Sequence, residues 1–460
     1  AAVASGDCDA FGDCATDDVS ALLTFQRPEA RRGLPRLRWE RPAPWWRMGP
    51  PSLTSGFQKC EMGERRWGCP LHGMQGQPTL VYPGGDTGCM SGEAYAFAVY
   101  PGASDKLAFY FQGGGACWVA NGAVGRQPVF HCTRDMDTAL QTSGRGWGIL
   151  NATNARNPFR EWTIVEPLYC SGDAFVGHGD MTVGNETFKQ RGFQNALAAK
   201  EWAAQHFRGV LSNFAVMGFS AGSLGTQSWA MSLLSAFSFR RGAVLLDSYA
   251  GLFPPSTQEA VIKEWGGCDT SLWPAAVRSM CHEGNLTVQY VGEETMRAFP
   301  DVAFGSIQSK GDGTQLWFYK GMAQSFGRAQ DMGMTGPQFY ARTNDIFVRY
   351  RSSSPNFAVY YIDGNHHCFL TSSDLVFKAS TAGMAAPPPD DKPTLLEWVE
   401  RLVGHRDCRS ECDGPVEAPA PGRGSAAYCA QHLVSLPLEM RAGHHGRPWW
   451  KRPAPIKAHV

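Results

Sequence analysis

The chain has 460 residues, enough for one large domain or two ordinary ones, and 43% of them are hydrophobic, as in a protein with a packed core. Its 42 Lys and Arg residues balance 42 Asp and Glu residues, so no net charge attracts nucleic acid or an anionic membrane. No stretch reaches the ~20 consecutive apolar residues that span a bilayer, so no transmembrane segment is expected.

The cysteines and the glycosylation sequons indicate the secretory pathway. The 14 cysteines extend from Cys8 to Cys429 without a Cys-x-x-Cys pair, a pattern typical of disulfides rather than of a metal site. Asn-x-Thr sequons begin at Asn151, Asn185 and Asn285. We therefore expect a secreted or secretory-pathway glycoprotein that holds no metal.

The two ends of the chain differ from its middle. Residues 1–77 contain a Pro-, Arg- and Trp-rich stretch, and residues 406–460 carry a similar one together with further cysteines. Such segments lack helical or strand periodicity, which predicts irregular extensions on both sides of a domain at 78–405. A carbohydrate contact through the Trp pairs is one interpretation of these ends, but a strap over the surface or a loose end is favoured.

Between these ends, apolar segments alternate with helical patterns. Strands are predicted at 94–100, 106–111, 162–166, 214–217, 242–247 and 357–362, and helices at 192–207, 223–234 and 395–403. This alternation is typical of an α/β domain, here an α/β-hydrolase-like one. We expect a mostly parallel central sheet with helices on both faces and the site at the carboxyl ends of its strands.

The pentapeptide Gly218-Phe219-Ser220-Ala221-Gly222 lies between a predicted strand and a predicted helix. A Gly-x-Ser-x-Gly turn in this context is a nucleophile elbow, in which small neighbours leave the serine hydroxyl accessible. The N-terminal amides of the following helix point back at the serine, where negative charge would develop. Ser220 is therefore the predicted nucleophile, and a plain strand-to-helix turn is the alternative.

A serine nucleophile needs a base and an acid, which follow it in the order acid then histidine in α/β-hydrolase chains. The predicted strand at 357–362 leads into a loop with two adjacent histidines, His366 and His367, and the residues alone do not choose between them. Two aspartates qualify by position as the acid. Asp247 ends the strand after the elbow, and Asp312 lies in a Gly-rich loop. The sequence pattern does not show which of the two is the acid.

A glycine run follows the predicted strand at 106–111. Residues 112–118 read Gln-Gly-Gly-Gly-Ala-Cys-Trp, upstream of the elbow, where lipases and esterases place the loop that donates backbone N–H groups to the oxyanion. A phosphate-binding loop is the alternative, but no Gly-Lys-Ser/Thr ending supports it.

These motifs together resemble the pectin acetylesterase family, which also contains the Notum carboxylesterases. The resemblance covers roughly residues 85–405 and rests on Gly113–Trp118, Pro167–Asp173, the elbow, Asp312–Gln315 and Gly364–Cys368. It implies Asp312 rather than Asp247 as the acid and His367 rather than His366 as the base. It further implies oxyanion donors at Gly114, Gly115 and Ala221, disulfides Cys89–Cys170 and Cys117–Cys132, and no cofactor.

The chain departs from plant members of the family at two points. Gly115 and Ala116 stand where a bulky aromatic residue is expected, and Lys310-Gly311 replaces the aromatic residue expected before Asp312. These differences weaken the inference that this protein shares the substrate of the plant members, but they leave the implied triad intact.

The expected function is hydrolysis of a carboxylic ester by a secreted enzyme, and the resemblance implies removal of O-acetyl groups from pectin or a related polysaccharide. One alternative is a Notum-like carboxylesterase that removes longer acyl groups from protein or lipid. Another is a catalytically silent relative that binds carbohydrate. The expected partner is an acylated polysaccharide or another ester substrate, and not nucleic acid.

Overall fold

The computed structural model describes residues 56–63, 68–122, 125–371, 375–384, 386–389, 391–406 and 409–412. The Trp- and Pro-rich segments near both ends of the chain lie outside these residues, as does most of the expected tail at 406–460.

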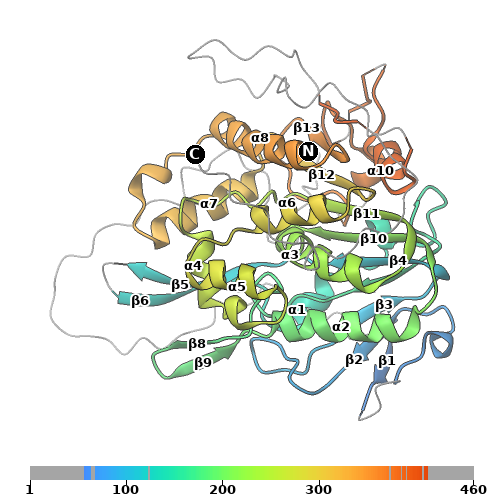
Figure 1. Ribbon diagram of the computed structural model, residues 1–460, viewed down its shortest axis with the longest axis horizontal. Helices are drawn as coiled ribbons and strands as arrows, with labels where there is room; N and C mark the ends of the chain where they lie inside the picture. Colours follow the sequence, from blue (N-terminus) through green and yellow to red (C-terminus); the bar gives the residue numbers. More distant parts are fainter. Residues whose placement is uncertain are drawn as a thin grey trace, which may run out of the picture. The chain divides into compact units, whose positions relative to one another are not determined.

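A nine-stranded sheet organises the described part of the chain, and most of its strands can be followed in order from β1 to β13 in Figure 1. Among the nine strands, β3 alone runs antiparallel to its neighbours, and the other pairings are parallel. The mostly parallel sheet predicted from the sequence is therefore confirmed. In sheet order the strands are β1 (Gln58–Glu61), β2 (Thr79–Tyr82), β3 (Phe97–Tyr100), β7 (Trp162–Glu166), β4 (Ala103–Phe111), β10 (Leu211–Phe219), β11 (Phe239–Asp247), β12 (Ala303–Ser309) and β13 (Phe357–Ile362).

Helices lie on both faces of this sheet, and two short hairpins project from it. The helices are α1 (Met136–Gln141), α2 (Gly192–His206), α3 (Ala221–Ala236), α4 (Gln258–Glu264), α5 (Ala275–His282), α6 (Val288–Ala298), α7 (Gly313–Ser325), α8 (Gly336–Ser353), α9 (Leu375–Lys378) and α10 (Leu395–Val403). The hairpins are β5 (Gly115–Gly122) with β6 (Gly125–Cys132), and β8 (Asp180–Val183) with β9 (Glu186–Lys189).

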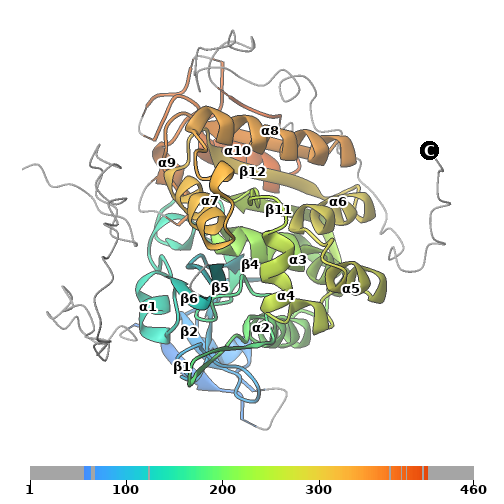
Figure 2. The same ribbon diagram turned by 90° about the vertical axis from the view of Figure 1, so that its left-hand side faces the viewer.

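Successive residues of β12 show which helices cover which face. A Cβ atom added to Gly305 would lie 2.5 Å from Leu402 and 2.9 Å from Trp398, both on α10. Phe304, one residue earlier, lines a small cavity together with residues of α3, α6 and α8. Because side chains alternate along a strand, α10 covers one face and α3, α6 and α8 cover the other. Figure 2 shows the sheet from its side, with α3 and α6 beside it.

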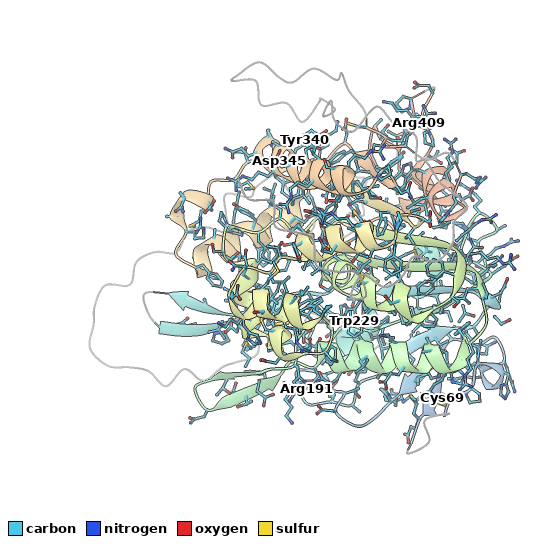
Figure 3. All side chains as sticks on the ribbon, in the orientation of Figure 1. Cys69, Arg191, Trp229, Tyr340, Asp345 and Arg409 are labelled. Carbon is cyan, nitrogen blue, oxygen red and sulfur yellow. A yellow bond between two sulfur atoms is a disulfide. The ribbon has the colours of Figure 1, made fainter. Side chains whose placement is uncertain are left out.

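The strand before the elbow has the composition of a strand covered on both faces. Residues 214–219 of β10 read Phe-Ala-Val-Met-Gly-Phe, and all six are buried. Trp229 of α3, labelled in Figure 3, stacks on Phe193 of α2 with ring centroids 5.7 Å apart and on Phe111 of β4, the strand beside β10, with centroids 6.5 Å apart. Its indole N–H donates to the carbonyl of Phe175 at 2.8 Å. A continuous apolar run is typical of parallel strands between two helical layers.

The chain joins β3 to β4 through Pro101-Gly102, but the two strands are not neighbours in the sheet. β7 lies between them, antiparallel to β3 and parallel to β4. Gly102 permits this arrangement, because a Cβ atom there would lie 2.4 Å from the carbonyl oxygen of Trp162 on β7. The Pro101-Gly102 turn therefore links two strands that flank a third.

The sheet extends beyond the boundaries that we expected from composition. β1 precedes residue 78 and pairs in parallel with β2. After residue 405, Glu411 lies beside β13, accepting from the Tyr361 N–H at 2.9 Å and donating its own N–H to Val359 at 2.8 Å. The division at 77/78 and 405/406 stays a prediction, but strand pairing continues past both positions.

Candidate active site

Ser220 occupies a strained turn between β10 and α3. Its backbone has φ of 52° and ψ of −123°, a region that a residue with a side chain seldom adopts. The neighbouring glycine is required by packing, since a Cβ atom on Gly222 would lie 2.0 Å from the carbonyl oxygen of Phe111. The Ser220 N–H donates to the carbonyl of Asp247 at 2.9 Å, which ties the turn to β11. The strand–turn–helix context predicted from the sequence is therefore present.

Three polar side chains from distant parts of the sequence meet at this turn. His367 Nε2 lies 2.9 Å from Ser220 Oγ. His367 Nδ1 lies 2.8 Å from Asp312 Oδ2 and 3.0 Å from Oδ1. The imidazole therefore bridges a hydroxyl and a carboxylate, and all three residues are less than 10% exposed.

Adjacent strands bring Asp312 and His367 together. Ser309 and Ile362, the last residues of β12 and β13, are register partners, so the loops that follow them run side by side. Within these loops the Gly311 N–H donates to Gly364 and the Gly313 N–H to Asn365, both at 2.9 Å. Parallel neighbours end at the same edge of a sheet, and this places both loops beside the elbow.

The Asp312 carboxylate is held in place by the first turn of α7. Asp312 is the N-cap of that helix, and its Oδ1 accepts the Gln315 N–H at 2.9 Å. The side-chain amide of Gln315 donates to Oδ2 at 2.8 Å. These donors fix the orientation of the carboxylate toward His367. The role of Gln315 could have been suspected from its place three residues after the N-cap.

The other acid and base candidates lie in different contacts. The Asp247 carboxylate accepts the N–H groups of Phe369 and Leu370 at 2.8 and 2.7 Å. The His366 ring packs on Phe369, with ring centroids 5.3 Å apart. The structure thus brings Asp312 and His367, rather than Asp247 and His366, into line with Ser220.

The glycine run at 113–115 packs closely against the elbow. A Cβ atom on Gly113 would lie 2.9 Å from the carbonyl oxygen of Phe219, and one on Gly115 would lie 1.9 Å from that of His131. Gly114 and Gly115 also have φ of 154° and 72°. Only glycine tolerates both the lack of space for a Cβ atom and these positive φ values, so the glycine run permits the loop to lie beside the serine.

Ala221 is the first residue of α3, where backbone N–H groups have no partner within the helix. Its amide and those of Gly114 and Gly115 are the donors that the resemblance implied for an oxyanion.

Two disulfides that the resemblance implied are formed. Cys117–Cys132 joins β5 to β6 directly after the glycine run, and Cys89–Cys170 links the loop before β3 to the segment after β7. The Cys117 N–H also donates to Gly172 at 2.8 Å, next to Cys170. Both disulfides therefore brace the backbone beside the glycine run.

A small apolar pocket opens beside Ser220. The centre of a water-sized sphere can reach about 20 Å³ of this pocket, which is little more than the space that one water molecule requires. Burial raises the pKa of Tyr249 and raises that of Tyr319 to about 12, so these phenols line the pocket as neutral groups. The lining residues are Gly115, Ala116, Ser220, Ala221, Leu224, Tyr249, Leu252, Phe253, Phe318, Tyr319 and Met322.

No motif in the sequence pointed to this lining. Phe318 and Met322 lie on α7, about two and about three turns beyond Asp312, but Leu252 and Phe253 belong to the loop after β11. Residues so far apart share no linear pattern, and the closeness of Phe318 to Asp312 was the one available signal.

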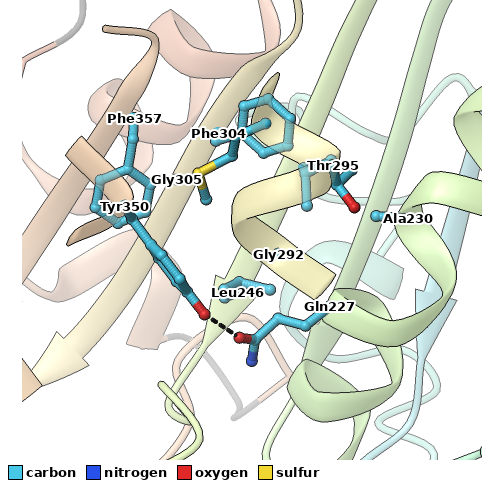
Figure 4. A pocket seen from close by; sticks show the side chains of 11 residues that line it. Gln227, Ala230, Leu246, Gly292, Thr295, Phe304, Gly305, Tyr350 and Phe357 are labelled. Atoms are coloured by element: carbon cyan, nitrogen blue, oxygen red, sulfur yellow. Dashed lines mark hydrogen bonds between the residues drawn. The ribbon is translucent and has the colours of Figure 1, made fainter. Parts of the chain in front are cut away.

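A second, smaller cavity lies between α3, α6, α8 and the sheet and does not include Ser220 (Figure 4). The Tyr350 hydroxyl donates to Gln227 Oε1 at 2.5 Å across it. The Gln227 amide donates in turn to the carbonyls of Ser223 and Tyr249, each at 3.3 Å. The centre of a water-sized sphere can reach only about 10 Å³ of this cavity, so it is a packing feature. The hydrogen bond from Gln227 supports the backbone of Tyr249 in the wall of the first pocket.

The contact set has the components that acyl transfer requires. An imidazole beside a serine hydroxyl can accept its proton, and a carboxylate on the other ring nitrogen keeps the required tautomer. Within the part of the chain that the structure describes, no group of His, Cys, Asp and Glu side chains is arranged to hold a metal ion.

Comparison with known proteins gives one family match. The family model described as Pectinacetylesterase matches residues 80–308, a range that includes the glycine run and the elbow. Two similar solved structures are both described as the Wnt deacylase Notum from Drosophila. One is 15% identical with a TM-score of 0.45, covering 69% of this chain and 90% of the other. The second is 16% identical with a TM-score of 0.40, covering 63% and 84%.

No curated protein matches the sequence. On its family match, this chain belongs to the pectinacetylesterase family of carboxylesterase-type hydrolases.

Proposed function

We propose that this protein is a secreted serine esterase that removes O-acetyl groups from pectin or a related polysaccharide. The observation that supports this function is the continuous contact from Ser220 through His367 to Asp312 beside a small apolar pocket. The family match supplies the substrate class.

In the proposed reaction, Ser220 Oγ attacks the acyl carbonyl carbon while His367 Nε2 takes the hydroxyl proton. The carbonyl oxygen becomes an oxyanion and accepts hydrogen bonds from the backbone N–H groups of Gly114, Gly115 and Ala221. Asp312 stabilises the imidazolium through Nδ1–H. The ester C–O bond then breaks, and Nε2 returns the proton to the departing alcohol oxygen.

A second half-reaction releases the acyl group. His367 removes a proton from a water molecule, whose oxygen attacks the acyl-enzyme carbonyl and forms a second oxyanion at the same donors. Collapse of this intermediate breaks the bond between the acyl carbon and Ser220 Oγ, His367 Nε2 returns the proton to Oγ, and the carboxylic acid leaves. Losing one oxyanion donor typically lowers turnover by ~10²–10³.

The pocket favours a short acyl group. Its room for about 20 Å³ of water-sized sphere centres suits an acetyl methyl group better than an extended alkyl chain. Aromatic rings from Tyr249, Phe253 and Phe318 border it, so a longer chain would have to displace large side chains.

Covalent labelling tests the nucleophile. A fluorophosphonate should label the wild-type protein at Ser220, and Ser220→Ala should abolish the labelling and lower kcat on 4-nitrophenyl acetate by at least ~10³-fold, because the nucleophile is removed. Thermal melting of the variant checks that it folds. Equal labelling of the two proteins would exclude Ser220 as the nucleophile.

Acyl-chain profiling tests the proposed substrate class. We expect kcat/KM for 4-nitrophenyl esters to fall by at least tenfold from acetate to hexanoate, because the pocket is short. Phe253→Ala should narrow this difference by enlarging the pocket, while Trp147→Ala, a change at an exposed residue outside the lining, should leave it unchanged. A wild-type preference for long esters would refute the acetyl assignment.

A further inference from the structure

Asp247 lies at the end of β11, between the strand that leads to the nucleophile and the strand that leads to the acid. Its backbone carbonyl accepts the Ser220 N–H and the Ser223 hydroxyl, both at 2.9 Å. The main chain of Asp247 therefore holds the turn that carries the nucleophile.

The side chain of the same residue holds the loop that carries the histidine. Asp247 Oδ2 accepts the N–H groups of Phe369 and Leu370 at 2.8 and 2.7 Å, and Oδ1 accepts the Ser248 hydroxyl at 2.8 Å. The Ser248 hydroxyl oxygen accepts the Cys368 N–H at 2.8 Å. The three consecutive N–H groups after His367 are thus bound by two adjacent residues.

This carboxylate is buried, with no solvent exposure. Burial raises the pKa of Asp247, while the N–H donors of Leu370 and Phe369 and the Ser248 hydroxyl lower it. Three donors to one carboxylate satisfy an ionised group, which can only accept hydrogen bonds. Removing it would leave two buried backbone N–H groups without an acceptor, a costly change.

The backbone conformation of Ser248 fixes the position of its hydroxyl. Ser248 has φ of 61°, which is uncommon for a residue other than glycine, and it is fully buried. The strained conformation directs the hydroxyl to the Cys368 N–H, and such strain persists only where surrounding contacts fix it.

We propose that Asp247 is a positioning residue, whose backbone and side chain together set the distance between Ser220 and His367. The inference rests on the proposed function, since it concerns the same nucleophile and base. Asp247 does not line the pocket, and its side chain reaches the base through the N–H groups of the loop at 368–370. A displacement of the base by about 1 Å can lower turnover by about 10²-fold.

A purely structural role for Asp247 would predict a different result. The chain offers a matched control in Asp173, which is also fully buried. Its carboxylate likewise accepts one hydroxyl and two backbone N–H groups, those of Ser171, Phe175 and Gly192. None of these donors belongs to the loops that carry Ser220, Asp312 or His367.

The experiment compares Asp247→Ala, Asp247→Asn, Ser248→Gly and Asp173→Ala with the wild type, using kcat and KM for 4-nitrophenyl acetate and thermal melting. We expect Asp247→Ala to lower kcat by about 100-fold with KM changed by less than threefold. Asp247→Asn keeps an acceptor oxygen, so its kcat should be at least tenfold higher than that of Asp247→Ala. Asp173→Ala should lower the melting temperature comparably but change kcat by less than threefold.

Ser248→Gly provides a second test of the positioning role if Asp247→Ala does not fold. Glycine accepts φ of 61° without strain, so this change removes only the hydroxyl, and kcat should fall by about five- to tenfold at nearly unchanged stability. A kcat within threefold of wild type in Asp247→Ala, or in Ser248→Gly where Asp247→Ala is unfolded, would overturn the inference. So would equal kcat losses in the Asp247 and Asp173 variants.

The fluorophosphonate reaction separates this failure from failure of the proposed function. Wild-type protein that is labelled at Ser220, combined with a normal kcat in the Asp247 and Ser248 variants, would overturn the positioning role alone. Wild-type protein that is not labelled would overturn both.

Discussion

At the scale of single residues, the candidate site contains two buried carboxylates that each accept several hydrogen bonds. Asp312 accepts the backbone N–H of Gln315, and Asp247 accepts those of Phe369 and Leu370. Glu166 differs, because its side chain is fully buried but receives one hydrogen bond, from the Tyr100 hydroxyl at 3.0 Å. Burial therefore raises the pKa of Glu166 well above its ordinary value.

This difference predicts the effect of Glu166→Gln on stability. Below the pKa of about 4.5 in the unfolded chain, Glu166 is protonated in both states and contributes no pH dependence. As the pH rises above that value, only the unfolded state ionises readily, so the wild type loses stability until the raised folded pKa is reached. Glutamine removes this loss, and thermal melts should show equal stability at pH 4 but a higher melting temperature for the variant at pH 8.

The exposed Glu186 on β9 provides the control for this prediction. Glu186→Gln should change the melting temperature little at either pH, because an exposed carboxylate is solvated in both states. A Glu166→Gln variant less stable than wild type at pH 8 would show that the folded protein keeps Glu166 ionised.

At the scale of elements, the β5–β6 hairpin connects the glycine run to the rest of the molecule. β5 begins at Gly115, and its first strand residues pair with the end of β6 at Cys132. The Tyr169 hydroxyl donates to the carbonyl of Gly115 at 2.9 Å, and the Cys117–Cys132 disulfide fixes the two strands two residues further on. The conformation of the glycine run therefore depends on this hairpin.

Removing the hairpin disulfide should affect both stability and turnover. The disulfide closes a separation of 15 residues, so replacing both Cys117 and Cys132 by Ser should cost about 3 kcal/mol. We also expect kcat on 4-nitrophenyl acetate to fall by at least tenfold, because the amides of the glycine run lose their fixed positions.

The Cys60–Cys69 disulfide is a control of similar size, with a separation of 9 residues. It lies near β1, away from the elbow, so its Ser/Ser variant should lose stability and retain kcat. Equal effects of the two variants on kcat would contradict a special role for the hairpin.

At the scale of the whole molecule, several features agree with an extracellular setting. Four disulfides lie within the described residues. In that part of the chain, no helix combines the length and hydrophobicity needed to cross a bilayer. Disulfides persist in oxidising compartments, which is consistent with secretion.

The sequons supply a test of this setting. Asn185, at the turn between β8 and β9, and Asn285, before α6, are exposed, whereas Asn151 is half-buried and its Oδ1 accepts hydrogen bonds from Thr153. We expect protein secreted from eukaryotic cells to carry N-linked glycans at Asn185 and Asn285. Asn185→Gln and Asn285→Gln should each remove one glycan mass, measured by mass spectrometry with and without glycosidase. Secreted protein without any glycan would contradict the prediction.

Local patterns in the sequence were sufficient for some of these features. The elbow at Ser220 could be predicted because strand, turn and helix follow one another directly, and the glycines are required by contacts as close as that of Gly222 with Phe111. The parallel sheet followed from the alternation of buried strands with helices. In both cases the information lies within a few consecutive residues.

The distances among acid, base and pocket were decided only by the tertiary structure. Asp247 and Asp312 each end or follow a strand beside the elbow, and the motifs alone left them even until the family resemblance favoured Asp312. Asp312 meets His367 because β12 and β13 are neighbours in register, while Asp247 reaches the amides beyond that histidine. Hydrogen bonding between strands sets this order, and the contacting residues are 55 and 122 positions apart, beyond the reach of any local pattern.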